Sequence, residues 1–357
     1  MGNQRRFFLG ANSGQGFQNL FNRFCEEERY YDLLVLKGGP GAGKSTMMRK
    51  IGEAMEAGGE TVEYFYCSGD PDSLDGVYIP RIKTAVLDGT SPHVIEPRYP
   101  AAVERYVNLG QFYNIAAAKS AREEIIQHTN SCSDAYRRSY RALSAAAQME
   151  ESAYGLLREA FDNEKLMRRT EGIIAREIKG KGSGAEMRCR FLGSVTHQGV
   201  VVHYETIESI CPKVYCIHDS YGFAFPMLQK ILDAAQGRNY GAIVCPDPEH
   251  MERIRSLLLP ELEVAFVTTK AGAACPCAAY RRIHVDAMVS QVYRKRWKGR
   301  LSFLRKMAQT LRDEGVATLR EAKAAHDALE EMYCPHVDFA GLDQLTAEEI
   351  ARIESYR

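Results

Sequence analysis

The same sequence pattern occurs twice in this chain, once in each half. Residues 8–17 read FLGANSGQGF, and residues 191–200 read FLGSVTHQGV. The match continues between YDLLVLKGGPGAGKSTMMRKI at 31–51 and KVYCIHDSYGFAFPMLQKI at 213–231, and then between IPRIKTAVLDG and LPELEVAFVTT. Self-similarity over so long a period indicates duplicated structural units. The chain must therefore fold as two related copies, and residues found in only one copy are candidates for chemistry.

A phosphate-binding loop is predicted in the first copy. The segment GGPGAGKS fits G-x-x-x-x-G-K-[ST] and lies between a strand expected at 33–36 and a helix expected at 46–57. Glycines let successive N–H groups point at one anion, and the helix N-terminus adds its dipole. The residues predicted to bind ATP are Gly38, Gly39, Gly41, Ala42, Gly43, Lys44, Ser45 and Thr46. Lys44 is expected to reach the β- and γ-phosphates and Ser45 to hold Mg²⁺. The alternative is a glycine-rich turn that binds nothing.

A second metal ligand is predicted at Asp88. It ends the apolar segment TAVLD, which is the position of the carboxylate that holds Mg²⁺ in many nucleotide-binding proteins. The alternative is a carboxylate that starts a turn with Gly89. Because residue 89 is glycine, the adjacent glutamate that many ATPases use as a base is missing. The group that positions water must come from elsewhere.

The second copy has lost these residues. The position of Lys44 has become Ala224 or Phe225, and Pro226 stands about where Ser45 does. Asp88 is matched by Thr268. This copy is therefore not expected to bind a nucleoside triphosphate in the usual way.

Acidic residues after the strand expected at 61–67 are further candidates. Asp70-Pro71-Asp72 is matched by Asp247-Pro248-Glu249, so both triplets are interpreted mainly as helix starts, with Asp as N-cap and Pro as the first helical residue. In the first copy, Asp72 or Asp75 could still orient water or Mg²⁺, and Asp72 is taken as a candidate catalytic residue.

His93 and Arg98 complete the candidate catalytic set. His93 lies in the short loop after Asp88, although a lone histidine is usually structural. Arg98 could act as an arginine finger from the same half. If the halves pack as a pseudo-dimer, Arg281 or Arg282 could reach the site from the second copy. The alternative is that all three arginines pair with surface carboxylates.

The order of the predicted elements indicates an α/β fold. We expect duplicated P-loop NTPase-like parallel sheets flanked by helices, each copy followed by a long helical hairpin. The first domain is predicted at 1–180 and the degenerate repeat at 185–357. The helical sections cover about 101–180 and 282–354, and a glycine-rich segment links the copies.

Composition sets limits on partners and compartment. The chain has 46 basic and 46 acidic residues, no apolar run long enough for a membrane helix and no signal-peptide core. Ten scattered cysteines agree with a reducing cytoplasm, which is the expected location. The run RKRWKGRLSFLRK at 294–306 has no acidic residue. It is interpreted as a solvated helix face paired with acidic neighbours, with nucleic-acid contact as the alternative.

The motifs resemble a bacterial family of tandem P-loop ATPases of unknown role. The resemblance rests on FFLGANSGQGF, LKGGPGAGKST, YFYCSGDPDSLDGVYIP and AVLDGTSPH, and it covers nearly the whole chain. In that family both halves often carry a phosphate loop, whereas the second half departs from the pattern here. The resemblance implies ATP binding and hydrolysis with Mg²⁺ and names no physiological substrate. The leading expectation is an ATPase or nucleotide-driven switch; the alternative is a kinase that transfers the γ-phosphoryl group to a small molecule or nucleotide.

Overall fold

Two six-stranded sheets with the same strand order form the body of the protein. The computed structural model describes residues 4–27, 29–184, 186–270 and 275–357. The first sheet has the order β1-β5-β6-β7-β4-β8, and the second has the order β9-β13-β14-β15-β12-β16. The strands of the first sheet are β1 (Gln4–Phe7), β4 (Asp32–Lys37), β5 (Val62–Tyr66), β6 (Leu74–Ile79), β7 (Thr84–Asp88) and β8 (Glu104–Asn108). Those of the second are β9 (Met187–Cys189), β12 (Lys213–His218), β13 (Ala242–Asp247), β14 (His250–Leu259), β15 (Val264–Thr269) and β16 (Ala279–His284).

Each sheet is mixed, so the prediction of parallel sheets was wrong at one strand per copy. β6 runs antiparallel to β5 and β7, and β14 runs antiparallel to β13 and β15, while the other pairs in both sheets are parallel. The prediction that Asp70-Pro71-Asp72 starts a helix was also wrong. The Asp70 carboxylate accepts the Asp72 N–H at 3.2 Å and closes a turn between β5 and β6. A connection this short joins antiparallel strands, because a parallel crossover needs a dozen or more residues.

One helix of each copy covers the outer face of its sheet. α2 (Lys44–Ala57) buries Met47, Met48, Ile51 and Met55, a spacing that puts them on one helical face. α7 (Phe225–Gln236) packs in the same way on the second sheet. The shorter helices α1 (Phe21–Glu27) and α6 (Tyr204–Ile210) contribute to an apolar core that residues of both copies share.

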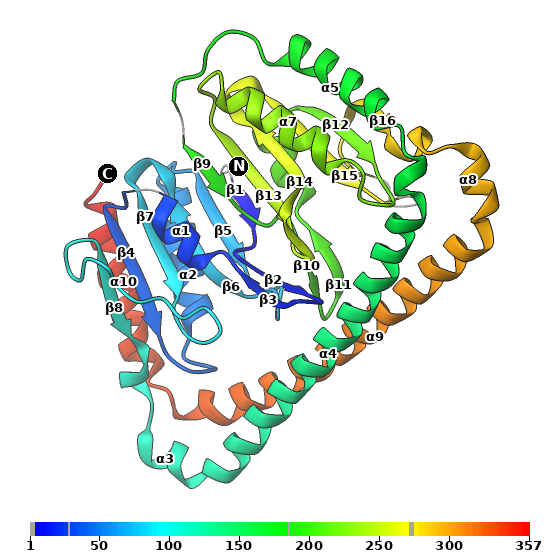
Figure 1. Cartoon of the computed structure of the whole chain (residues 1–357). Coiled ribbons are helices and arrows are strands. Elements are labelled where there is room, and N and C mark those ends of the chain that lie inside the picture. The colour runs from blue at the N-terminus through cyan, green and yellow to red at the C-terminus, as the bar shows by residue number, and fades with distance from the viewer. Residues whose placement is uncertain (1–3, 28, 185, 271–274) are drawn as a thin grey trace.

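The two copies meet through a small sheet to which each contributes a hairpin. The hairpins are β2 (Gly10–Ser13) with β3 (Gly16–Asn19), and β10 (Gly193–Thr196) with β11 (Gly199–Val202). Their order is β11-β10-β2-β3, so equivalent strands pair at the centre. Figure 1 shows this sheet between the two larger ones.

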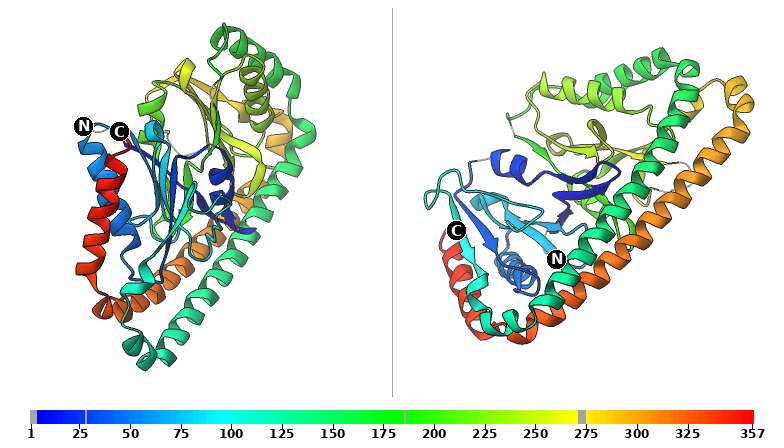
Figure 2. Two further views of the ribbon diagram at one scale, coloured as in Figure 1. Left: turned by 90° about the vertical axis from the view of Figure 1, so that its left-hand side faces the viewer. Right: turned by 60° about the horizontal axis from the view of Figure 1, so that its bottom comes forward.

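Two long helices connect the ends of the molecule. α4 (Arg122–Leu157) and α9 (Lys298–Tyr333) have 36 residues each, follow the short helices α3 (Ile115–Ser120) and α8 (Gln291–Arg296), and run side by side in opposite directions (Figures 1 and 2). The prediction of a hairpin within each copy was therefore wrong. The two long helices of the two copies pack on each other, and the Ser139 hydroxyl of α4 donates to the Gly315 carbonyl of α9 at 2.9 Å.

The last helix of each copy packs on the other copy. α5 (Asn163–Glu177) contacts α7, and α10 (Phe339–Glu354) contacts α2. Leu342 and Ile353 of α10 thus belong to the core around α2, whereas Leu166 and Ile173 of α5 belong to the core of the second sheet. The division of the chain at 180–185 stays a prediction. Short 3-10 helices occur at Pro80–Ile82, Leu109–Phe112, Arg158–Ala160, Pro260–Leu262, Val285–Met288 and Cys334–His336. Within the described ranges, no helix has the length and apolar character needed to cross a membrane.

Candidate functional site

The glycine-rich loop joins the carboxyl end of β4 to the amino end of α2. Gly41 and Gly43 adopt φ angles of 69° and 76°, a left-handed region that favours glycine. Among the residues that the structure describes, no side chain caps α2. The first N–H groups of an α-helix lack intrahelical partners, and together with the helix dipole they attract an anion.

The Lys44 ammonium group is folded back over this loop. Its Nζ donates to the carbonyl oxygens of Gly38 at 2.7 Å and Gly39 at 2.9 Å. It also lies 3.6 Å from Oδ2 of Asp88, and both side chains are largely buried. The structure therefore brings together the cation and the carboxylate that the sequence predicted at one site.

Ser45 and Asp88 each have a side-chain oxygen that accepts hydrogen bonds from a neighbouring segment. Ser45 Oγ accepts the Leu74 N–H at 2.9 Å, which ties α2 to β6. Asp88 Oδ1 accepts hydrogen bonds from the Thr90 N–H at 2.8 Å and the Thr90 hydroxyl at 2.6 Å. Asp88 thus closes a turn, which was the alternative to metal binding that the sequence left open. Its second oxygen, Oδ2, still faces Lys44.

Asp75 and His93 form a buried pair beside these residues. His93 Nε2 lies 3.3 Å from Asp75 Oδ2, and both side chains are less than a tenth exposed. Burial raises the pKa of Asp75, the adjacent His93 lowers it, and the nearby Asp88 raises it. The His93 ring packs against Phe17 and Phe21, which fixes its orientation. From the sequence, His93 was among the candidates, but Asp72 was preferred to Asp75. Asp75 lies on β6, which pairs with β7 and so places Asp75 next to Asp88; this strand was not predicted.

The structure leaves two predicted catalytic side chains away from this cluster. The Asp72 carboxylate accepts a hydrogen bond from Gln198 of the second copy at 3.1 Å. Arg98 pairs with Glu26 at 3.1 Å, and both side chains are more than half exposed. Arg281 and Arg282 lie on β16, at the edge of the second sheet and far from the loop in Figure 1. None of these three arginines is brought to the glycine-rich loop.

Residues near the end of the chain press against the loop instead. A Cβ atom added to Gly43 would lie 2.4 Å from Leu342 Cδ2, and one added to Gly41 would lie 2.9 Å from Cys334 Sγ. These close approaches are a second reason for glycine at both positions. Earlier in the chain, on α9, Lys323 Nζ lies 3.5 Å from Asp70 Oδ2. The second copy therefore frames the site of the first.

One group on α9 has the spacing of metal ligands. His326, Asp327 and Glu330 each bring one ligand atom within 4.8 Å of the others. Lys323 already pairs with Asp327, so this carboxylate is neutralised without a metal.

In the second copy, a carboxylate of the protein fills the equivalent loop. Asp219 follows β12 as Gly38 follows β4, and it is 8% exposed. Its oxygens accept backbone N–H groups from four consecutive residues at 2.7–3.3 Å; the donors are Tyr221, Gly222, Phe223 and Ala224. Burial raises the pKa of Asp219, and these hydrogen bonds oppose the rise. The loop thus keeps its ring of N–H donors but satisfies them internally.

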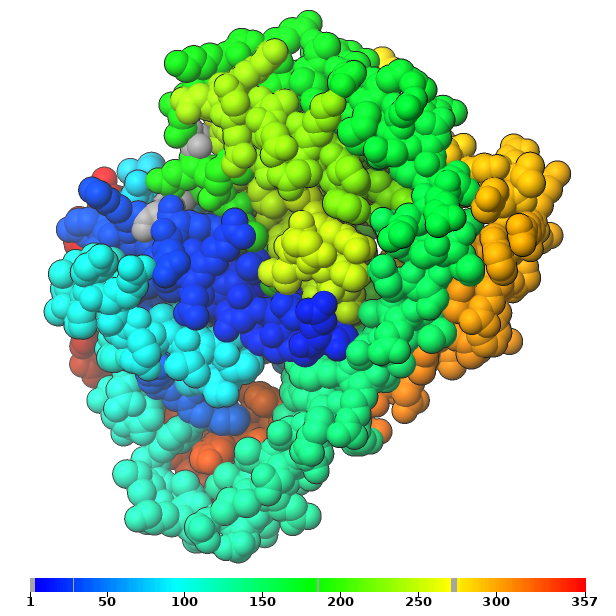
Figure 3. Space-filling view, viewed as in Figure 1, coloured from blue at the N-terminus to red at the C-terminus, as the bar shows by residue number. Residues whose placement is uncertain are grey.

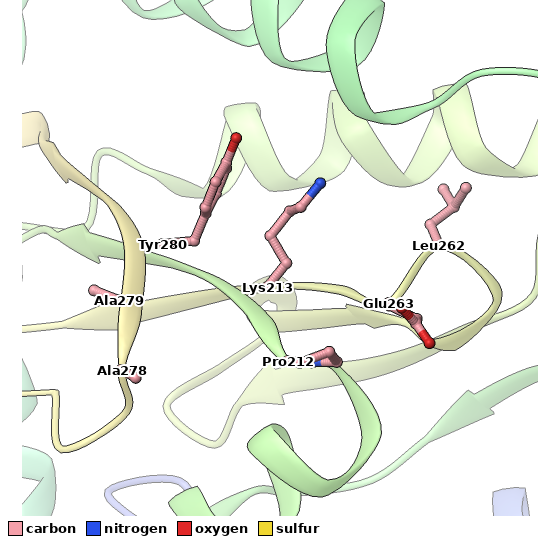
Figure 4. A pocket seen from close by; sticks show the side chains of 7 residues that line it. All are labelled: Pro212, Lys213, Leu262, Glu263, Ala278, Ala279 and Tyr280. Atoms are coloured by element: carbon pink, nitrogen blue, oxygen red, sulfur yellow. The ribbon is translucent and has the colours of Figure 1, made fainter.

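The cavity shown in Figure 4 lies elsewhere. It has a volume of about 520 Å³ and is lined by Pro212, Lys213, Leu262, Glu263, Ala278, Ala279 and Tyr280. These residues lie at the amino ends of β12, β15 and β16, whereas ligands of open α/β sheets bind at the carboxyl ends of the strands. The Lys213 ammonium is already 3.0 Å from Glu177. We therefore place the candidate site at the loop of the first copy.

Comparison with protein families finds a match over part of the first copy. The family described as "Nephrocystin 3, N-terminal" matches residues 17–78, a segment that contains β4, the glycine-rich loop and α2. The match covers only a small part of the chain. No curated protein and no solved structure matches the chain.

Proposed function

We propose that the chain binds ATP with Mg²⁺ at residues 38–46 and acts as an ATPase or nucleotide-driven switch. The observation that carries this proposal is the glycine-rich loop at the start of α2, where the Lys44 ammonium lies 3.6 Å from the Asp88 carboxylate and Ser45 is the next residue of the helix. A glycine-rich loop between a buried strand and a helix supplies the anion site. The family match at 17–78 covers the same segment.

The residues around the loop fit a magnesium ion. Mg²⁺ prefers oxygen ligands, and the Ser45 hydroxyl and the Asp88 carboxylate supply them. The buried Asp75 carboxylate, with Oδ2 3.3 Å from His93 Nε2, is close enough to Asp88 and Lys44 for their charges to interact, which suits a carboxylate near a cation. The ion would neutralise charge on the β- and γ-phosphates.

Lys44 and His93 are assigned the two remaining roles, phosphate binding and the positioning of water. Lys44 exchanges the carbonyl oxygens of Gly38 and Gly39 for phosphate oxygens, which are stronger acceptors for an ammonium group. His93, oriented by Asp75, is the proposed group that positions the attacking water. It takes the place of the glutamate that is missing after Asp88.

The second copy is proposed to be a partner without its own nucleotide. Asp219 occupies its anion site. The first residue of α7 is Phe225, whereas the first residue of α2 is Lys44. This asymmetry supports membership of a tandem P-loop ATPase group with one active copy. One ATP per chain is the resulting stoichiometry.

Titration calorimetry with ATP and Mg²⁺ tests the proposal. We expect one site per chain, lost in Lys44→Ala and kept in Lys50→Ala, which removes an exposed cation from the same helix. Release of free phosphate without an acceptor identifies an ATPase, and turnover that requires an added acceptor identifies a kinase. Two sites per chain, or equal binding by Lys44→Ala, contradicts the proposal.

A further inference from the structure

A cluster of cations covers the segment where α8 ends and α9 begins. We call residues 294–306 the basic tip; it comprises the end of α8 and the start of α9. Its cations are Arg294, Lys295, Arg296, Lys298, Arg300, Arg305 and Lys306. No acidic residue occurs between Asp286 and Asp313, although the whole chain has a net charge of zero. The segment lies at the outer edge of the molecule (Figure 3).

Within the ranges that the structure describes, these cations have no acidic partner, contrary to the prediction from sequence. Among the described residues, no carboxylate lies within ion-pair distance of any cation of the basic tip. All but Arg294 are exposed, and the buried Arg294 Nε has no hydrogen-bond partner in the described part of the chain. The nearest cation along the helix that is paired, Arg312, bonds Glu150 and lies outside the tip. The charge of the tip is therefore open to a ligand.

The equivalent segment of the first copy, at the start of α4, shows whether such charges are needed for the helix itself. The first turn of α4 contains Glu123 and Glu124, and Arg122 pairs with Glu123 at 2.8 Å. The first turn of α9 has no acidic residue. Acidic side chains near a helix N-terminus stabilise the helix, and cations there oppose its dipole. Helix stability thus accounts for the charges of α4 but not for those of the basic tip.

Aromatic rings lie among the cations. Tyr293 and Phe303 are 39% and 48% exposed. The Arg300 guanidinium lies 5.2 Å from the centre of the Phe303 ring, and that of Arg296 lies 5.4 Å from Trp297. Cations that follow a phosphate backbone, together with exposed rings on which bases stack, are the components of single-stranded nucleic-acid sites.

A lipid surface fits the same charges less well. An interfacial helix inserts a continuous apolar face into the bilayer. On α9 that face is made by Leu301, Leu304 and Ala308, which are buried against the protein. α8 has only six residues, so it cannot supply such a face either.

We propose that the basic tip binds the phosphate backbone of single-stranded nucleic acid, with Tyr293 and Phe303 stacking on bases. The field at the amino end of α9 adds to the attraction. The same helix ends at Tyr333, next to the glycine-rich loop, so one rigid element of about 54 Å joins the two sites. The binding itself needs no nucleotide and is independent of the proposed ATP site.

Fluorescence anisotropy of a labelled oligothymidine with the full chain, without ATP, tests the proposal. The test variant is Lys298→Gln/Arg300→Gln/Arg305→Gln. The matched control is Lys119→Gln/Arg122→Gln/Arg141→Gln, which removes three exposed cations from α3 and α4 of the first copy. We expect affinity that falls as salt rises, at least about tenfold weaker binding by the test variant, and a logarithmic salt slope smaller by about 2. The control variant should bind like the wild type.

A single substitution distinguishes a loss of oligonucleotide binding from a loss of folding. Lys298→Glu should weaken oligonucleotide binding while leaving or raising the unfolding temperature, because it adds an acidic residue at the start of α9. The proposal is overturned if the wild type does not bind the oligonucleotide, if both triple variants bind equally, or if vesicles of phosphatidylserine and phosphatidylcholine bind in its place.

Discussion

Phe8 and Phe191, which occupy the same position in the two copies, exchange both of their backbone hydrogen bonds. The Phe8 N–H donates to the Phe191 carbonyl at 2.8 Å, and the Phe191 N–H donates to the Phe8 carbonyl at 2.9 Å. Equivalent residues that pair with each other define a local two-fold relation between the copies. The protein is thus an intramolecular pseudo-dimer, centred on the repeat that opens each half.

This relation explains how each copy reaches the loops of the other. The Gly14 N–H donates to the Glu249 carboxylate at 2.9 Å, and, on the other side, Gln198 donates to Asp72. The turn that follows β5 or β13 is therefore held by the hairpin of the opposite copy. The second copy builds part of the surroundings of the candidate ATP site even though its own loop is filled.

Asp88→Asn and Asp75→Asn should both reduce Mg²⁺-dependent ATP turnover by at least about a hundredfold, because each removes a charge near the predicted ion. Asp72→Asn is the matched control, since its carboxylate bonds Gln198 and not the loop. Turnover should be measured as phosphate release across a range of Mg²⁺ concentrations. Wild-type turnover in Asp75→Asn would remove the Asp75–His93 pair from the mechanism.

Asp219→Gly should open the anion site of the second copy. Four N–H groups lose their acceptor; the hydrogen bonds of Phe223 and Ala224 are buried, and each unsatisfied buried donor costs about 1–3 kcal/mol. We expect a lower unfolding temperature that inorganic phosphate or sulfate partly restores. Asp233→Ala, an exposed change on α7, should show no such anion dependence. A variant that phosphate does not stabilise would show that the loop has lost its affinity for anions.

Arg190→Ala should destabilise the protein by about 3–5 kcal/mol, because it leaves buried carboxylates without their counter-ion. Arg190 is 1% exposed and lies 2.6 Å from Glu27 and 3.5 Å from Glu63. Arg23→Ala removes an exposed partner of the same Glu27 and should cost less than about 1 kcal/mol. Urea unfolding measures both, and similar losses would mean that the Arg190 ion pairs contribute little.

Glu249→Gln should reduce the pH dependence of stability. Burial raises the pKa of Glu249 from its ordinary value of 4.5 to about 7, with the Gly14 N–H opposing the rise. The folded protein thus holds this proton more tightly than the unfolded chain does, so the stabilisation is present below pH 4.5 and is lost as the pH rises to about 7. Thermal unfolding of both proteins between about pH 5 and about pH 8 measures the difference. Parallel curves would show that Glu249 titrates normally.

The sequence alone determined the duplication, the α/β class and the loop with its two flanking elements. These features are local: a strand, a glycine-rich turn and a helix are adjacent in the chain, and their periodicity and residue types indicate them directly. The loss of Lys44 and Ser45 from the second copy could be read in the same way. The antiparallel strands β6 and β14 were missed because the turn before each was taken for a helix start.

Only the tertiary structure decided which copy each helix packs on and how the site is completed. Both copies carry the same apolar faces, so the sequence cannot tell whether α4 packs on its own half or on α9 of the other. The Asp75–His93 pair depends on β6 lying beside β7, and the role of Asp219 depends on the fold of its loop. These are long-range contacts whose partners compete on nearly equal terms, and only the packing of the whole chain selects among them.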